Sequence, residues 1–87
     1  MEAMTDEIDS RIKSIFCDEL GLDDGSVDDA TSYDSTEAWD SLRHLQLVSR
    51  FEEEFGIELP VDDVIAMSTF KKVREIVKRN LADKGAT

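Results

Sequence analysis

Apolar residues recur at steps of three and four along three stretches of this 87-residue chain, and no stretch alternates apolar and polar residues over the length of a strand. This spacing gathers apolar side chains on one face of a helix, so each stretch predicts an amphipathic helix. A chain this short holds one hydrophobic core. We therefore expect an all-α fold, a small four-helix bundle of three main helices plus a short third helix, with a long first loop.

The expected fold is a single domain over residues 1–87, with a structured core at about 5–82 and a frayed tail at 83–87. Gly21 and Gly56 are natural stops for the first two helices. The predicted helices cover residues 5–20, a stretch that begins at Asp40 or Ser41 and ends at Phe55, residues 61–67, and a last stretch capped by Ser68 or Thr69. Their apolar faces comprise Ile8, Ile12, Ile15, Phe16 and Leu20 in the first helix, His44, Leu47, Val48, Phe51 and Phe55 in the second, and Phe70, Val73, Ile76, Val77 and Leu81 in the last.

Residues 21–40 show no helical period and are rich in Asp, Ser, Thr and Gly, which favour local turns. A loop of this length in a small domain is usually functional or is held by scattered apolar side chains. The glycines of this segment lack the flanking acids of a calcium-binding loop, so we expect solvated charge and predict no metal site. The expected anchors of the loop are Leu22, Val27, Tyr33 and Trp39.

The chain carries 21 acidic and 10 basic residues, for a net charge of −11 at pH 7. Residues 1–63 hold 19 of the acids, whereas residues 64–87 are net basic. An acidic surface repels a phosphate backbone and an anionic membrane, so we expect no nucleic-acid partner and no membrane insertion. A self-contained enzyme cleft is disfavoured by the small size. A carrier, an adaptor or a binding module fits better.

Cys17 is the one cysteine, and on a helical wheel it lies opposite the apolar stripe of the first helix. We therefore expect an exposed, idle thiol and no internal disulfide. The first residues lack the cationic and apolar segments of a signal peptide, and no apolar run reaches membrane-spanning length. The expected location is the cytoplasm.

Ser41 stands where the acidic loop meets the second helix, and the free N–H groups of a helix N-terminus favour an attached or bound phosphate. The alternative is that Asp40 and Ser41 only cap the helix. A third interpretation makes Ser41 a nucleophile with His44 as its base, but His44 falls on the apolar face and no glycine-rich turn surrounds Ser41. Leu42 lies roughly 160° from the centre of that face. It is either a singly exposed leucine or is covered by something outside the chain.

The second helix carries a longer pattern. An Asp-Ser-Leu tripeptide is followed by a Leu-x-Leu-Val spacing, a Phe-Glu-Glu-Glu-Phe-Gly-Ile run and a Leu-Pro-x-Asp-Asp-Val segment. The stretch 39–60 thereby resembles the prosthetic-group segment of the acyl carrier protein family. The resemblance extends from about Ile8 to Leu81, because that family also has a long first loop, a short third helix and a last helix opened by a pair such as Thr69-Phe70.

The resemblance implies a carrier that is not itself an enzyme. Ser41, between Asp40 and Leu42, would receive 4'-phosphopantetheine from coenzyme A through a separate, magnesium-dependent phosphopantetheinyl transferase. An acyl- or aminoacyl-loading enzyme would charge the terminal thiol as a thioester, and downstream synthases or transferases would use it. The implied partner-docking residues are Trp39, Leu42, Arg43, Gln46, Glu52, Glu53, Val64 and Ile65. The implied lining of an acyl pocket is Leu45, Val48, Leu59, Val64 and Met67.

Four residues depart from the pattern of fatty-acid-synthesis carriers. Arg43 and Gln46 stand where that pattern has acids, Arg50 adds a further positive charge, and Trp39 replaces a small residue. The docking face then has mixed sign, so we expect a discrete, monomeric carrier for polyketide, nonribosomal-peptide or another specialised pathway. The alternatives are a carrier for general fatty-acid synthesis and an unmodified helical interaction module, which would have no chemical need for the Ser41 hydroxyl.

Overall fold

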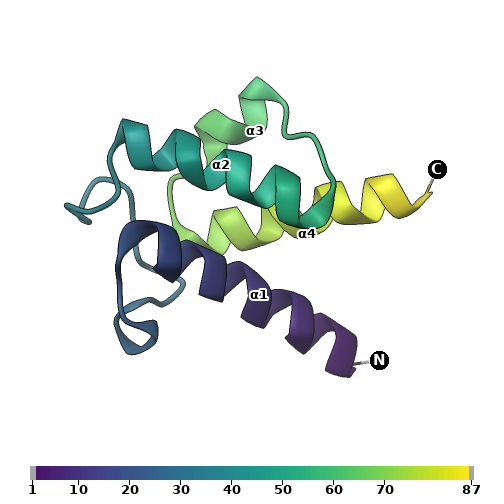
Figure 1. The fold of residues 1–87 in the computed structure, drawn as a ribbon, viewed down its shortest axis with the longest axis horizontal. Helices are drawn as coiled ribbons and strands as arrows, with labels where there is room; N and C mark the ends of the chain where they lie inside the picture. The colour runs from purple at the N-terminus through teal and green to yellow at the C-terminus, as the bar shows by residue number, and fades with distance from the viewer. Residues whose placement is uncertain (1, 87) are drawn as a thin grey trace.

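The structure is a computed structural model that describes residues 2–86. Figure 1 shows α1 and α2 running in opposite directions, α4 running the same way as α2, and the short α3 on the side of α2 away from α1. The long loop between α1 and α2 lies at one end of the bundle, and both termini lie at the other. The elements are α1 (Glu2–Leu20), the 3-10 turn η1 (Asp24–Ser26), α2 (Ser41–Phe55), α3 (Val61–Ala66) and α4 (Phe70–Ala86). The predicted all-α bundle is confirmed.

One core joins the apolar faces of α1, α2 and α4. Phe16 lies among aromatic rings, with Trp39 edge-on at 4.9 Å between ring centroids and Phe70 at the same distance. Such aromatic contacts add to the stabilisation from buried area. The predicted faces are confirmed, except that Ile8, His44 and Leu81 at their edges are half-buried.

The loop is pinned by the predicted anchors. Val27 and Trp39 are buried, and Leu22 and Tyr33 are half-buried against the core. Two features of the loop were not predicted: the turn η1, and an isolated bridge between Ser32 and Thr69. In this bridge the Tyr33 N–H donates to Ser68 O at 2.9 Å and the Phe70 N–H donates to Thr31 O at 2.8 Å. Turn-forming residues predict that the chain bends locally. They do not predict which distant segment the loop pairs with, here the segment around Thr69.

The helix ends follow the expected caps. Asp40 caps α2, and Gly21 and Gly56 end α1 and α2 with φ of 67° and 63°, in the left-handed region that glycine favours. The Thr69 hydroxyl accepts the Lys72 N–H at 3.2 Å, so Thr69 and not Ser68 caps α4.

Three boundaries differ from the predictions. α1 begins three residues before the predicted start at 5, and α3 ends one residue before the predicted end at 67. The tail predicted to fray is helical through Ala86, and Thr87 lies outside the described residues. The last turns of α4 have a tertiary contact that the apolar pattern does not reveal, because Lys84 Nζ donates to Phe55 O at the end of α2 (3.4 Å).

The expectation of an exposed thiol at Cys17 is wrong, because its side chain is only 8% exposed. The segment that follows α1 turns back beside this face of the helix, and the Leu22 N–H donates to Cys17 O at 2.9 Å. Burial, with the nearby Asp24 carboxylate, raises the pKa of the Cys17 thiol. A helical wheel shows which side of a helix is apolar. It does not show whether a neighbouring segment packs over the opposite side, as the segment after α1 does here.

Candidate functional site

Ser41 is the first residue of α2, and its side chain is exposed. The Asp40 carboxylate accepts the Arg43 N–H at 2.8 Å, and Asp40 O accepts the His44 N–H at 2.8 Å. Asp40 therefore does the capping. Within residues 2–86 no hydrogen bond holds the Ser41 hydroxyl, so it is free to react at the positive end of the helix dipole.

A cavity of about 270 Å³ opens beside Ser41, between α2, α3 and the end of the loop. Its walls are mostly apolar. The lining residues are Tyr33, Asp34, Ser41, His44, Leu45, Val64, Ile65, Met67 and Ser68.

This cavity contains three of the five residues expected to line an acyl pocket, namely Leu45, Val64 and Met67. Val48 and Leu59 do not line it: both side chains are buried in the core cluster. Helical spacing identifies which side chains point inward but not which of them border a gap. Tyr33, Asp34 and Ser68 were missed, since their position depends on how the loop closes.

His44 is engaged at both ring nitrogens. The Trp39 Nε1–H donates to His44 Nδ1 at 2.9 Å, and His44 Nε2 lies 2.8 Å from Val64 O. An indole N–H can only donate, so Nδ1 accepts, and Nε2 must carry the proton that it donates to Val64 O. A ring held in this way has no free lone pair for the Ser41 proton. The interpretation of Ser41 and His44 as a nucleophile and base is therefore not supported.

Two expected docking residues have structural contacts instead. Trp39 is 1% exposed, so its indole cannot meet a partner surface, and that expectation is wrong. A large aromatic residue in a loop can be buried in the core or exposed at an interface, and the sequence alone does not distinguish the two. Here the side chain of Trp39 is buried in the core. Glu52 is half-buried, and its carboxylate accepts the Leu59 N–H at 2.9 Å, which holds the turn after α2.

The remaining docking candidates are side chains of α2 and α3, and among them the Arg43 guanidinium donates to Glu19 O near the end of α1 (3.2 Å). Leu42 is 64% exposed and Ile65 74% exposed, while Val64 is half-buried. Arg43, Gln46 and Glu53 are exposed. Leu45 and Val61 add exposed apolar surface that had not been assigned to docking. This set of side chains, Leu42, Arg43, Leu45, Gln46, Glu53, Val61 and Ile65, is called the α2–α3 face below.

Arg50 neutralises acids along the junction of α1 and α2. Its guanidinium lies 3.1 Å from Asp18, 2.8 Å from Glu19 and 3.4 Å from Glu54, and these hydrogen bonds raise its pKa. Arg11 also pairs with Glu54, at 3.1 Å. The acids at this junction therefore present less negative charge to a partner than their number implies.

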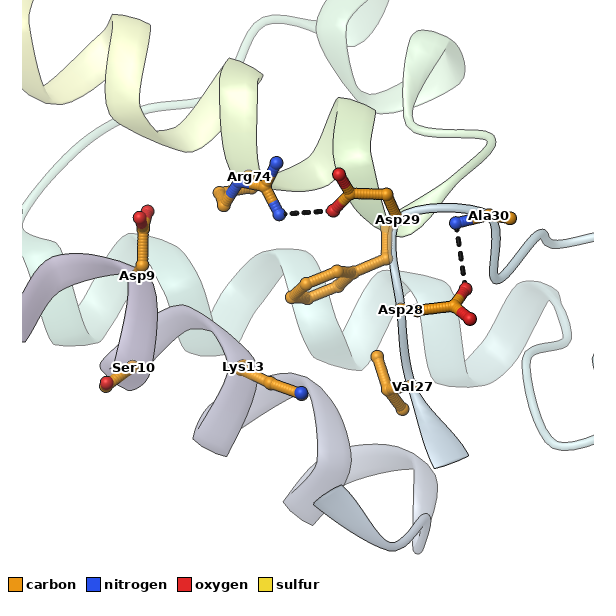
Figure 2. Close-up of a pocket in the computed structure, with 9 residues that line it drawn as sticks. Asp9, Ser10, Lys13, Val27, Asp28, Asp29, Ala30 and Arg74 are labelled. Atoms are coloured by element: carbon orange, nitrogen blue, oxygen red, sulfur yellow. Dashed lines mark hydrogen bonds and ion pairs between the residues drawn. The ribbon is translucent and has the colours of Figure 1, made fainter. Parts of the chain in front are cut away.

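A larger polar groove of about 590 Å³ lies between α1, the loop and the start of α4 (Figure 2). Arg74 points at Asp29, with a distance of 2.6 Å, and Asp28 accepts the Ala30 N–H at 2.9 Å. None of the residues that the sequence singled out for chemistry lines it. The Arg74–Asp29 contact ties the loop to α4.

No group of three or more His, Cys, Asp or Glu side chains in the described part of the chain is placed to hold a metal ion. Among residues 2–86, no helix is long and apolar enough to span a membrane.

The fold and site define a class of protein: a small helical carrier that presents one exposed serine at a helix start beside an apolar cavity. Residues 10–81 match the family described as phosphopantetheine attachment site, and the chain belongs to that family. Members of this family are carriers that hold 4'-phosphopantetheine covalently and are not themselves catalytic. The fold is similar to the solution NMR structure of holo acyl carrier protein from Geobacter metallireducens, with a TM-score of 0.78, 23% sequence identity and 90% of each chain covered.

Proposed function

We propose that Ser41 is the residue that carries the phosphopantetheine arm. The observation that supports this most strongly is the free, exposed Ser41 hydroxyl, which Asp40 leaves available by capping the helix itself. The positive end of the α2 dipole favours a phosphodiester at this position. The adjoining cavity is lined by Ser41 and by the apolar side chains of Leu45, Val64 and Met67, so its residues fit an arm that begins at Ser41 and an attached acyl chain. When bound, the arm supplies a terminal thiol that holds an acyl or aminoacyl group as a thioester.

The attachment is tested by intact mass after incubation with coenzyme A, magnesium and a broad-specificity phosphopantetheinyl transferase. The wild-type chain and a Ser49→Ala control, changed at another exposed serine of α2, should each gain one arm. Ser41→Ala should gain none while remaining folded. An arm on Ser41→Ala, or none on the wild type with several transferases, overturns the proposal. The second result makes an unmodified interaction module the leading function.

We also propose that the protein is a discrete, monomeric, cytoplasmic carrier of a specialised pathway, and that partners dock on the α2–α3 face. The support is the charge of that face, where Arg43 is cationic and Gln46 neutral, both exposed next to Leu42. Rim charges mainly set the encounter rate and the choice of partner. Enzymes that bind an acidic helix through a basic patch would be repelled by the positive charge of Arg43. The partners are a transferase, a loading enzyme and downstream synthases or transferases.

The pathway proposal is tested with the holo protein and a fatty-acid ketosynthase. Turnover should be at least tenfold below that of a carrier from general fatty-acid synthesis, and the double variant Arg43→Glu, Gln46→Glu should recover much of the difference. Lys72→Glu, at an exposed position of α4, serves as the control for added negative charge away from this face. Equal turnover of the wild type and the fatty-acid carrier would contradict the proposal.

A further inference from the structure

The end of the long loop, the start of α2 and the distant α3 meet through one imidazole. Trp39 ends the long loop, His44 lies in the second turn of α2, and Val64 belongs to α3. The bond from the Trp39 indole to His44 is 2.9 Å and the bond from His44 to the Val64 carbonyl is 2.8 Å. The rings of Tyr33 and Trp39 lie 6.0 and 5.9 Å from the imidazole, centroid to centroid. We call Trp39, His44 and Val64 the latch.

The two bonds of the latch require the same imidazole tautomer. Trp39 is buried, and a buried indole N–H without an acceptor destabilises the folded state. His44 Nδ1 is the acceptor that the structure provides, and it accepts only in the tautomer that carries its proton on Nε2. That proton in turn needs an acceptor, which Val64 O supplies. Trp39 in the loop and Val64 in α3 thus hold the same tautomer from opposite sides of the ring.

α3 has few other contacts that fix its position. It has six residues, none of them fully buried, and Val61 and Ile65 are strongly exposed. A helix this short is not stable by itself. Besides the latch, Asp63 pairs with Arg79 and Asn80 of α4, and Met67 is buried just after the helix.

The latch also crosses the cavity beside Ser41. His44 lines it from α2, and Val64 lines it from α3. We propose that the Trp39–His44 pair, through the Nε2–H tautomer, sets the distance between α2 and α3 and thereby the width of this cavity. His44 is thus a positioning residue for an arm or attached chain that enters the cavity from Ser41. That an attached chain enters the cavity from Ser41 rests on the proposed function. The effect of the Trp39–His44 pair on the position of α3 does not.

The test uses the full, unmodified chain, so it stands or fails independently of Ser41 modification. Amide hydrogen exchange is followed at Val64 and Met67 around α3, and at Val73 and Val77 in the core of α4. His44→Leu should speed exchange around α3 at least tenfold and change the α4 core less than twofold. His44→Gln, which keeps a donor and an acceptor, should recover part of the protection. Leu42→Ala, an exposed change on α2, is the matched control and should alter neither region.

Trp39→Phe is the sharper variant because it does not touch α3. Without the indole N–H, the imidazole loses its bond to the loop but keeps its bond to Val64 O, so exchange around α3 should rise more than exchange in the core of α4. Unchanged exchange around α3 in both His44→Leu and Trp39→Phe, or an equal rise in both regions, overturns the latch.

A measurement on the wild type needs no variant. Nitrogen-15 NMR of the His44 ring should show Nε2 protonated and Nδ1 unprotonated at pH 8. A ring protonated on Nδ1 instead overturns the proposal.

Discussion

Asp40 and Ser41 are neighbours with different roles at the start of α2. The sequence allowed either one to cap the helix, because both side chains have the required oxygen. The structure assigns the cap to Asp40, whose carboxylate accepts the Arg43 N–H at 2.8 Å. The choice matters for function, because a serine that capped the helix would have its hydroxyl oxygen engaged as an acceptor.

The position of Cys17 leads to a prediction about reactivity. Its burial and raised pKa both reduce the thiolate that alkylating reagents attack, so the folded protein should react with iodoacetamide at pH 8 at least tenfold more slowly than the protein in urea. The loss of free thiol measures the rate. Equal rates with and without urea would show that the thiol is exposed after all.

At the scale of elements, Gly56 gives α2 its end. It adopts φ 63° and ψ 40°, where a side chain costs about 1–2 kcal/mol. An added Cβ would lie 3.0 Å from Lys84 Nζ, the flexible end of a side chain that moves aside readily. Gly56→Ala should therefore lower Tm by roughly 4–8 °C for each kcal/mol lost, measured by circular dichroism.

Gly25→Ala is the matched control for this change. Gly25 lies outside the left-handed region, and an added Cβ would meet nothing within 4 Å. Its Tm should not fall. A Gly56→Ala variant as stable as Gly25→Ala would contradict the assigned helix end.

Asp63 joins α3 to α4 in a pH-dependent way. Hydrogen bonds from Arg79 at 2.6 Å and Asn80 at 3.1 Å hold the pKa of its carboxyl below the ordinary 3.8. A carboxyl whose pKa is lowered by folding stabilises the protein above its ordinary pKa, and this stabilisation is lost as the pH falls through the lowered pKa. Asp63→Asn should therefore be less stable than the wild type at neutral pH, with the gap narrowing below about pH 4.

Urea unfolding at pH 6, 4 and 3 measures that gap. Asp62→Asn, an exposed change one residue earlier, controls for removal of a charge from the same helix. Identical pH profiles for the two variants would contradict the role given to the Asp63 contacts.

The elements were largely predictable from the sequence, whereas the site was predictable only in part. Apolar spacing locates α1, α2 and α4 because each helix buries one face against the others. It says nothing about where the loop pairs, so the bridge at Thr69 and the cover over Cys17 were missed. It likewise could not show that Trp39 binds His44, because that contact depends on how the loop closes over α2.

At the scale of the whole molecule, charge opposes folding. The net charge is −11, and the acids are concentrated in residues 1–63. Self-repulsion should loosen the fold at low ionic strength. Surface ion pairs are also screened by salt, but exposed pairs contribute only about 0–1 kcal/mol each. The repulsion should therefore dominate, and Tm should rise between about 10 mM and 150 mM salt, where the Debye length falls from roughly 30 to 8 Å. An unchanged or lower Tm would count against this balance.

The central claim is that the arm hangs from Ser41. The most direct measurement is two-dimensional phosphorus–proton NMR of the transferase-treated protein, which detects the nucleus that links arm and chain. The account predicts one phosphodiester resonance, correlated with the β-protons of Ser41. A resonance correlated with another serine, or protein that carries no phosphorus after treatment with several transferases, would contradict it.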